Sequence, residues 1–226
     1  MFLGRYARKL RSQGTELYDR RIGLSQRAKE PYATHVPILV GVAAAFRPES
    51  LIEFGAGTFS TLSFVDDVAF PSLQRVESYE NNRNWFEQVR EKIPSNSRIH
   101  LQFVEGDMYR AVRNANTFGA AMIFIDDSPT AKERASTVDE VARQCGTRPV
   151  VVLHDYDLWR LRLATRKFEN RISFDAFNPQ SCVMWHGHPE RRPALENVKR
   201  IIHRHATVVP LTDIRAWTKI FSIELR

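Results

Sequence analysis

Two closely spaced glycines and a later acidic residue have the spacing of a nucleoside-binding turn. Gly55 and Gly57 follow an apolar run that contains Glu53, and Glu80 comes 23 residues after Gly57. Glycine lets the chain turn sharply and lets backbone N–H groups approach a ligand. An acidic residue about 20 positions beyond such a turn typically accepts hydrogen bonds from ribose hydroxyls. An ordinary strand-to-helix turn, followed by a surface glutamate, stays open as the alternative.

A second acidic side chain could bind an adenine ring. Asp107 and Met108 follow the run IHLQFVE. The carboxylate of Asp107 could accept a hydrogen bond from the exocyclic amine of adenine, with Met108 against the ring. Aspartate is also a favoured N-cap residue, so a purely structural role at a helix start stays open.

A histidine and two aspartates could move a proton. Asp126 follows the run MIFI, and His154 and Asp155 follow VVVL. Imidazole has an ordinary pKa of about 6.5, so His154 could act as a general base that Asp126 or Asp155 orients. Alternatively, His154 only bridges strand ends by hydrogen bonding.

These residues all lie at the ends of candidate strands. Short β-branched or apolar runs alternate with longer segments of helical periodicity. The expected strands are residues 50–54, 73–79, 99–105, 120–126 and 149–155, and the expected helices lie near 58–69, 82–92, 107–115, 130–145, 157–167 and 191–205. The run VPILVGVAAAF, residues 36–46, predicts a buried helix.

The alternation predicts a doubly wound, Rossmann-like α/β sheet that is mainly parallel, with helices on both faces. Residues 172–177 and 182–187 are strand-like and flank the turn-rich NPQS, which predicts a C-terminal antiparallel hairpin and seven strands in all. In such sheets, ligands bind at the carboxyl ends of strands, where strand order reverses. The candidate residues are therefore expected along one edge of the sheet.

The segments LIEFGAGTFST, VESYE, FVEGDM, FIDD and VVLHDYD resemble the class I S-adenosylmethionine-dependent methyltransferases over about residues 34–186. The likeness is greatest to small-molecule O-methyltransferase-like members. It implies an S-adenosyl-L-methionine cofactor, with Glu80 at the ribose. The cofactor-binding residues that it implies are Glu53, Gly55, Ala56, Gly57, Thr58, Ser60, Thr61, Glu80, Asn81, Asp107, Met108 and Asp126.

The glycine turn departs from the family's fullest pattern, because Phe59 stands where the last glycine would fall. Many members lack that glycine, so methyl-donor binding stays the expectation. A dinucleotide-binding G-x-G-x-x-G would need a glycine at Ser60, which disfavours NAD. Thr58, Ser60 and Thr61 could offer hydroxyls to the amino-acid end of the donor, although these residue types also suit a helix start.

The resemblance favours a small-molecule hydroxyl oxygen as the methyl acceptor. The segment IDDSPT lacks the N/D-P-P-Y/F motif of many N-methylating members, and no cysteine follows the fourth or fifth expected strand. Residues expected to line the acceptor site are Tyr32, His35, Tyr156 and Trp159.

A divalent metal is the second route to an activated hydroxyl, since it could bind substrate oxygens and lower their pKa. Asp126 and Asp155 roughly match the ligands of metal-dependent members. However, His154 suits hard Mg²⁺ poorly, so the metal is not favoured and no metal ligand is assigned.

Two other functions stay open. Aminopropyl transfer uses the same fold, but its acidic substrate signature is not evident. The net charge of +7 is concentrated in residues 1–30 and 189–226 and could contact nucleic-acid phosphates or an anionic membrane. A solvated basic surface is the preferred interpretation, because no RNA-binding signature accompanies the charge. A nucleic-acid partner is thus not favoured, and a homodimer stays open.

The domain organisation expected is a basic N-terminal helical extension (1–33), a methyltransferase domain (34–188) and a C-terminal helical extension on the same domain (189–226). No secretory signal is visible, and no apolar run reaches the roughly 20 residues of a membrane span. Cys145 and Cys182 have no metal-like spacing, so a reducing cytoplasm is the expected compartment.

Overall fold

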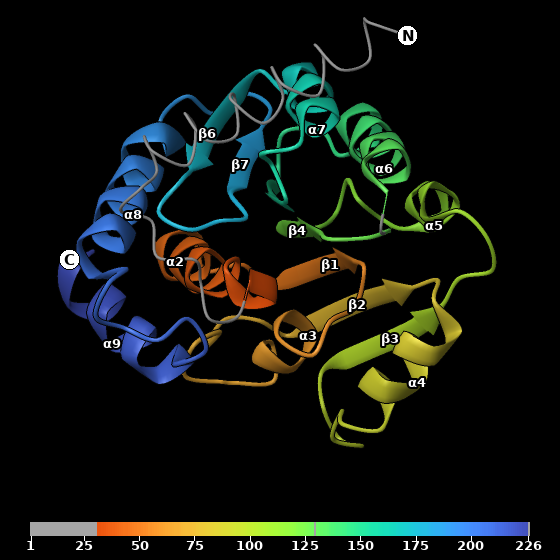
Figure 1. The fold of residues 1–226 in the computed structure, drawn as a ribbon, viewed down its shortest axis with the longest axis horizontal. Coiled ribbons are helices and arrows are strands. Elements are labelled where there is room, and N and C mark those ends of the chain that lie inside the picture. Colours follow the sequence, from red (N-terminus) through yellow and green to blue (C-terminus); the bar gives the residue numbers. More distant parts are fainter. Residues whose placement is uncertain (1–30, 129, 226) are drawn as a thin grey trace, which may run out of the picture.

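The computed structural model describes residues 31–128 and 130–225, in which seven strands form one sheet (Figure 1). The strand order is β3-β2-β1-β4-β5-β7-β6. The bounds are β1 (Ser50–Phe54), β2 (Arg75–Glu80), β3 (Ile99–Phe103), β4 (Met122–Ile125), β5 (Val150–His154), β6 (Asn170–Phe174) and β7 (Ser181–Trp185). Strands β1 to β5 pair in parallel, and β7 pairs antiparallel with both β5 and β6. The predicted fold class is confirmed, including its C-terminal hairpin.

The helices follow the predicted alternation closely. They are η1 (Pro31–Ala33), α2 (Val36–Phe46), α3 (Ser60–Ser63), α4 (Arg83–Arg90), α5 (Met108–Asn114), α6 (Ala131–Gln144), α7 (Trp159–Ala164), η2 (Thr165–Lys167), α8 (Arg191–His205) and α9 (Ile214–Glu224). The helix expected near 58–69 is limited to the single turn of α3. The side chain of Asp66 accepts hydrogen bonds from the backbone N–H groups of Val68 and Ala69, and this local turn takes the place of a longer helix.

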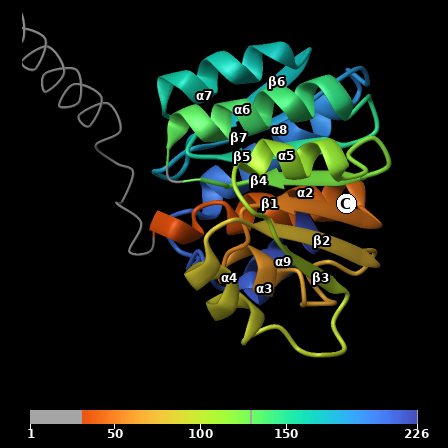
Figure 2. The ribbon, with the colours of Figure 1, turned by 90° about the vertical axis from the view of Figure 1, so that its right-hand side faces the viewer.

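The helices lie in two layers on the sheet. Figure 2 shows α5, α6 and α7 together on one side of it. Their apolar side chains form one core with Ile123 and Ile125 of β4, whereas Met122 and Phe124 of the same strand pack into the core shared with α2, α8 and α9. Because β4 is buried on both faces, its sequence MIFI is apolar at every position.

The apolar helix α2 is enclosed by the two C-terminal helices. A Cβ atom added at Gly41 would lie 2.5 Å from Val198 of α8 and 2.7 Å from Phe221 of α9, so both helices press closely on α2. Helix α9 starts at the N-cap Asp213, whose side chain accepts a hydrogen bond from the N–H of Ala216. This packing explains why α2 is hydrophobic all round rather than amphipathic.

The strand order reverses at β1, which lies between β2 and β4. The carboxyl ends of β1, β2, β4 and β5 therefore meet at the place where doubly wound sheets bind their ligands. In the described part of the chain, the helices are too short or too polar to cross a membrane.

Candidate functional site

The turn after β1 is shaped by its contact with β4. Gly55 has a φ of +92°, and a Cβ atom there would lie 2.4 Å from the carbonyl oxygen of Asp126. The N–H groups of Gly55 and Ala56 both donate to the carbonyl oxygen of Tyr79 at the end of β2. Gly55 is therefore needed for the junction of three strands, which only a residue without a side chain can make. Gly57 has no positive φ, and the nearest atom to its Cβ position is Ser60 Oγ at 3.0 Å.

Glu53 holds this turn from inside the protein. Its buried carboxylate oxygen Oε2 accepts hydrogen bonds from Thr61 Oγ1 at 2.7 Å and from Ser78 Oγ at 2.6 Å. Thr61 Oγ1 in turn accepts from the N–H of Gly57 at 2.9 Å. Burial raises the pKa of Glu53 to about 7, although the hydroxyls of Ser60, Ser78 and Thr61 oppose the shift. The predicted cofactor contacts of Glu53 and Thr61 stay predictions, since these side chains are bonded to each other.

Glu80 ends β2 beside the same turn. Its side chain is 6% exposed, and its Oε1 accepts a hydrogen bond from the N–H of Asn82 at 2.7 Å. Burial raises the pKa of Glu80 to about 7, whereas the backbone N–H groups of Asn82, Asn81 and Ala56 oppose the shift. A carboxylate that is nearly buried, yet next to the glycine turn, is suited to accept hydrogen bonds from a ligand's hydroxyls.

Trp85 also contacts the turn, and sequence reasoning missed it. Its indole Nε1 donates a hydrogen bond to the carbonyl oxygen of Ala56, while its side chain remains 38% exposed. The N-cap Asn82 accepts from the N–H of Trp85, which fixes the first turn of α4 next to the end of β2. The signal in the sequence was an aromatic residue three positions after a good N-cap residue.

The two residues predicted at the adenine lie differently. Asp107 is exposed and occupies the N-cap position of α5, but its side chain makes no capping hydrogen bond within the described residues. Met108 is buried in the core on the α5 side of the sheet. Asn81 Nδ2 donates to the carbonyl oxygen of Gly106 at 2.9 Å, which ties the ends of β2 and β3 together. The adenine contacts of Asp107 and Met108 stay predictions.

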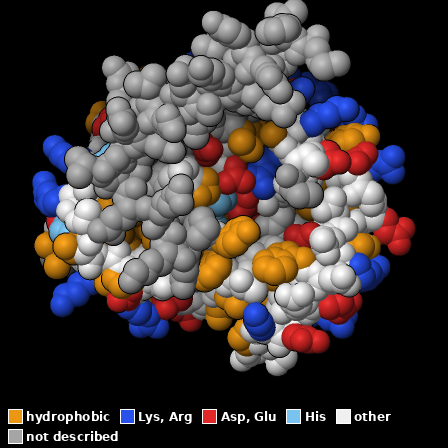
Figure 3. Space-filling view, viewed as in Figure 1, with side chains coloured by type: hydrophobic (Ala, Val, Ile, Leu, Met, Phe, Trp, Pro, Cys, Tyr) orange, Lys and Arg blue, Asp and Glu red, His pale blue; other side chains and the backbone are white. Residues whose placement is uncertain are grey.

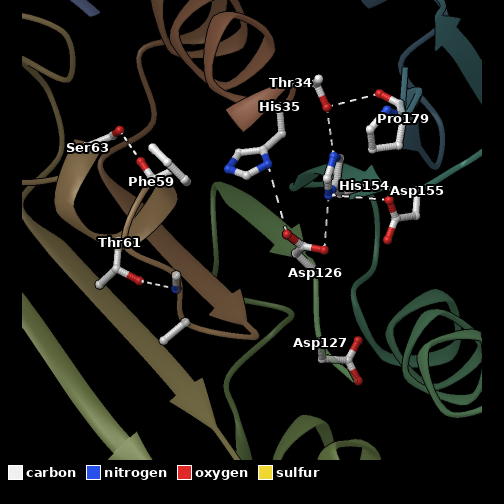
Figure 4. Close-up of polar contacts among 12 residues, drawn as sticks. Thr34, His35, Phe59, Thr61, Ser63, Asp126, Asp127, His154, Asp155 and Pro179 are labelled. Atoms are coloured by element: carbon white, nitrogen blue, oxygen red, sulfur yellow. Dashed lines mark hydrogen bonds and ion pairs between the residues drawn. The ribbon is translucent and has the colours of Figure 1, made fainter. Parts of the chain in front are cut away.

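The structure brings the three predicted catalytic residues together (Figure 4). Asp126 Oδ1 lies 3.2 Å from His154 Nδ1, and Asp155 Oδ1 lies 3.7 Å from the same nitrogen. Asp126 keeps 23% of its side chain exposed and Asp155 keeps 31%, whereas His154 keeps 3%. Figure 3 shows a hollow near the middle of this face, where acidic, basic and histidine side chains meet.

Arg134 of α6 organises this cluster and was not foreseen. Its Nη1 lies 3.0 Å from Asp126 Oδ1 and 2.6 Å from Asp155 Oδ2, and its Nε and Nη2 donate to the carbonyl oxygens of Asp127 and Ser128. The arginine is only 7% exposed. The sequence did hold a signal for its burial. Arg134 falls on the same helical stripe as Thr137, Val138 and Val141, which face the core.

His154 is bonded at both ring nitrogens. Its Nε2 lies 2.8 Å from Thr34 Oγ1, and that hydroxyl donates to the carbonyl oxygen of Pro179 at 3.0 Å. With the hydroxyl proton directed to Pro179, Nε2–H of His154 donates to Thr34 and Nδ1–H donates to Asp126. Burial alone would lower the pKa of His154, but the Asp126 and Asp155 carboxylates raise it above its ordinary value. The arrangement therefore fits an imidazolium.

His35 joins the cluster from the residue before α2. It is 2% exposed, its Nδ1 lies 4.0 Å from Asp126 Oδ2, and its ring meets that of His154 edge-on at 4.8 Å between centroids. Neither ring nitrogen has a hydrogen-bond partner among the described residues. Burial, with the nearby charge of His154, lowers the pKa of His35 to about 3. His35 is thus a neutral imidazole, inside the cluster rather than on an outer rim.

The other residues expected to line an acceptor site are less enclosed. Tyr32 is 76% exposed and Trp159 is 62% exposed, while Tyr156 is partly buried. A separate cavity of about 220 Å³ lies beside the glycine turn. It is lined by Val36, Thr58, Phe59, Leu62, Ser63, Thr212 and Ile214. The segment that leads into α9 therefore closes one side of the space next to α3.

Two non-glycine residues at this edge have unusual backbone conformations. Ser128 and Asp155 both have a φ of +57°, in the left-handed region that residues with a side chain rarely adopt. They follow β4 and β5, and each is held by Arg134, through the carbonyl oxygen of Ser128 and the carboxylate of Asp155. Such strain persists where the surroundings enforce it, as is common at functional sites.

The chain matches no protein-family model and no curated protein sequence. Solved structures do match it. Spermidine synthase from Thermotoga maritima is 15% identical, with 84% of this chain and 75% of that chain covered and a TM-score of 0.53. Human methyltransferase-like protein 13 in complex with SAH is 16% identical, with 80% of this chain and 94% of that chain covered and a TM-score of 0.53. The O-methyltransferase from Bacillus cereus in complex with SAH is 11% identical, with 77% of this chain and 90% of that chain covered and a TM-score of 0.50.

At these identities the likeness concerns the fold. The chain has the Rossmann-like fold of S-adenosylmethionine-dependent methyltransferases, which the spermidine synthase shares. The resemblance inferred from the sequence segments is confirmed at this level.

Proposed function

We propose that this chain is an S-adenosyl-L-methionine-dependent methyltransferase whose acceptor is a hydroxyl oxygen of a small molecule. The observation that carries the proposal is the position of Glu80. Its nearly buried carboxylate lies beside the glycine turn at the reversal of strand order, in a fold that two SAH complexes share. A ligand with vicinal hydroxyls suits a carboxylate at that place.

The residues at the edge fit an adenosyl cofactor. Glu80 would accept hydrogen bonds from the ribose hydroxyls, and Asn81 and the exposed Asp107 lie on the adjoining strand ends, where an adenine would follow. Gly57 and Thr58 leave the turn accessible on the side of α3. When bound, the cofactor supplies a methyl group on a positively charged sulfur. The task left to the chain is to align the acceptor and handle its proton.

Asp126 is the group best placed to meet the acceptor. Burial would raise its pKa, but His154 and Arg134 lower the pKa of Asp126 to about 2. Its Oδ1 is bonded to those two residues, and its Oδ2 faces His35. Asp126 would therefore accept a hydrogen bond from the acceptor hydroxyl and orient it, while His154 and Asp155 fix Asp126 and Arg134. His154 acts as a base only after it has lost the proton on Nδ1.

This electrostatic setting favours acceptors that ionise readily. A carboxylate with a pKa of about 2 is a weak base, so it removes a proton from an ordinary alcohol inefficiently. Phenols and other acidic hydroxyls need less help, because their own pKa is lower than that of an alcohol. We therefore place phenolic compounds first among the acceptors to be screened.

Calorimetry with S-adenosylmethionine, SAH and NAD tests the cofactor assignment. We expect both sulfur compounds to bind with one site per chain and NAD to give no heat of binding. Binding of NAD without binding of either sulfur compound would overturn the proposal. Transfer of radiolabelled methyl to a panel of phenols, with anilines of matched shape as controls, then tests the oxygen assignment.

Aminopropyl transfer is the second candidate. It is favoured by the structural likeness to spermidine synthase and by three carboxyl groups at the edge, those of Asp126, Asp127 and Asp155. Arg134 contacts Asp126 and Asp155 and so reduces their attraction for a polyamine. Tighter binding of decarboxylated S-adenosylmethionine than of S-adenosylmethionine itself would favour this candidate.

RNA is an alternative acceptor for a protein of this fold. An RNA-modifying protein of the same fold would bind RNA with an affinity that falls steeply with salt, and it would methylate that RNA. We instead propose a small-molecule acceptor and a cytoplasmic location. A homodimer is tested by light scattering on the purified chain.

A further inference from the structure

Within residues 31–128 and 130–225, the imidazole of His35 lacks the hydrogen bonds that a buried polar ring normally makes. Both of its nitrogens are buried, and neither has a partner among the described residues. An unsatisfied buried polar group costs on the order of 1–3 kcal/mol. Such a group in a native protein calls for an explanation, such as a bound water or ion, stored strain or a catalytic role. His35 lies against Asp126 and His154 and not in an isolated apolar site, so a ligand that all three residues share would satisfy it.

The three side chains lie close enough together for small side-chain shifts to make them ligands of one ion. One nitrogen from each histidine and one carboxylate oxygen of Asp126 all lie within 4.8 Å of one another. The distance of 4.0 Å between His35 Nδ1 and Asp126 Oδ2 is too long for a hydrogen bond. Two ligands of a tetrahedral metal with bonds of about 2.0–2.2 Å lie roughly 3.3–3.6 Å apart, so a side-chain shift of about half an ångström would bring both atoms onto one ion.

The surrounding residues fix two of these ligands in the way that metal sites require. The Nε2 atom of His154 is bonded to Thr34 Oγ1, which directs Nδ1 toward Asp126. Asp126 Oδ1 is bonded to Arg134, which leaves Oδ2 facing His35. Metal-bound imidazoles and carboxylates usually have such second hydrogen bonds, which set the ring tautomer and the orientation.

We propose that His35, Asp126 and His154 form a binding site for a divalent transition metal ion of the Zn²⁺, Fe²⁺ and Co²⁺ group. Two imidazoles and one carboxylate are a nitrogen-rich set that suits these borderline ions and not Mg²⁺. With Asp126 and Asp155 alone, His154 disfavours a hard metal such as Mg²⁺. Together with His35 it favours a softer one.

Arg134 is the positive charge that opposes such an ion. Its Nη1 lies 3.0 Å from Asp126 Oδ1, but it is also bound by Asp155 at 2.6 Å, so the guanidinium is already paired. The metal takes Asp126 Oδ2, a nitrogen of His35 and Nδ1 of His154, from which a proton is released to solvent. Asp126 is the ligand with appreciable exposure, so further coordination positions open toward solvent on its side.

Cobalt titration of the purified full chain tests the site without any substrate or methyl donor. We expect one Co²⁺ per chain, seen as visible d–d absorption and as cobalt retained through gel filtration. His35→Gln should lower the Co²⁺ affinity at least tenfold. His188→Gln is the control, because His188 lies outside the cluster and is paired with Glu190 at the surface. Equal affinity of His35→Gln and the unchanged chain would overturn the proposal, as would the absence of Co²⁺ binding by the unchanged chain.

A second measurement needs no variant and so does not depend on the folding of His35→Gln. In histidine-labelled protein, paramagnetic Co²⁺ should shift or broaden the ring signals of His35 and His154 and leave those of His188 and His203 unchanged. Effects on all histidines alike would mean non-specific binding and overturn the site. The role of the metal in activating an acceptor rests on the proposed methyltransferase function. SAH binding measured on metal-free protein separates failure of that function from failure of the metal site.

Discussion

The Nη1 atom of Arg134 lies 2.6 Å from the Oδ2 atom of Asp155, so a residue of α6 holds the first residue after β5. The same guanidinium contacts Asp126 and the carbonyl oxygens of Asp127 and Ser128 after β4. The loops after two neighbouring strands are thereby fixed by one side chain, and the position of the candidate catalytic carboxylates depends on it.

Replacing Arg134 should therefore destabilise the protein strongly. Arg134→Met leaves Asp126 and Asp155 without their buried cation, and breaking a buried pair in this way costs about 3–5 kcal/mol. Arg134→Lys should recover only part of the loss, because an ammonium cannot reach all four acceptors. Urea unfolding measures both variants. The control is Lys132→Met, an exposed basic residue on the same helix, for which we expect a change below about 1 kcal/mol.

Replacing the two glycines of the turn by alanine should destabilise the protein to very different extents. Gly55→Ala introduces a Cβ atom 2.4 Å from the Asp126 carbonyl oxygen at a φ of +92°, so we expect a loss of more than about 2 kcal/mol or insoluble protein. Gly57→Ala meets only Ser60 Oγ at 3.0 Å and should cost less than about 1 kcal/mol. Thermal unfolding of the two variants side by side measures the difference. Similar melting temperatures would contradict the role assigned to Gly55.

The buried carboxyl of Glu53 should make stability depend on pH. Its pKa is raised from 4.5 to about 7 in the folded chain, so the folded state binds the proton more tightly than the unfolded state. This contribution to stability is complete below pH 4.5 and decreases as the pH rises through 7.

Glu53→Gln has no such titration. Its unfolding free energy should therefore fall less between pH 5 and pH 8 than that of the unchanged chain, by about 1–3 kcal/mol. Denaturant titrations at the two pH values measure it, with exposed Glu91→Gln as the control. Parallel pH profiles of Glu53→Gln and the unchanged chain would show that Glu53 does not hold its proton near neutrality.

Glu80→Ala should weaken SAH binding at least tenfold, because it removes the acceptor of the ribose hydroxyls. Calorimetry measures the affinity, and Glu91→Ala on the outer end of α4 serves as the matched control. Since burial raises the pKa of Glu80 to about 7, SAH binding that needs the ionised carboxylate should tighten as the pH rises from 6 to 8. Unaltered affinity in Glu80→Ala would remove the ribose assignment.

Most of the sheet could be predicted from the sequence because strand signals are local. The runs SLIEF and VVVL alternate with helical segments, and turn residues flank them, so strand positions and the hairpin followed from periodicity. The helix after β1 was predicted too long because Asp66 forms a local turn with its own backbone neighbours, which apolar periodicity does not reveal.

The site was predictable where it depends on strand ends and not where it depends on helix packing. Asp126 and Asp155 directly follow the neighbouring parallel strands β4 and β5, and His154 is the last residue of β5, so the topology alone brings them together. Arg134 lies on α6, and its approach to the cluster is set by how that helix packs. His35 was expected to line the acceptor site, but its contact with Asp126 and His154 depends on how α2 packs. A charged residue in an apolar stripe was the only trace of Arg134 in the sequence.

The enclosure of α2 by α8 and α9 has a consequence for synthesis on the ribosome. Residues 36–46, apolar on every side, emerge early, whereas residues 191–205 and 214–224, which cover them, are made much later. For most of translation, the nascent chain therefore exposes a hydrophobic helix that lacks the two helices that finally cover it. Chaperone capture of this segment during synthesis, and aggregation of chains released before residue 214, are the expected results.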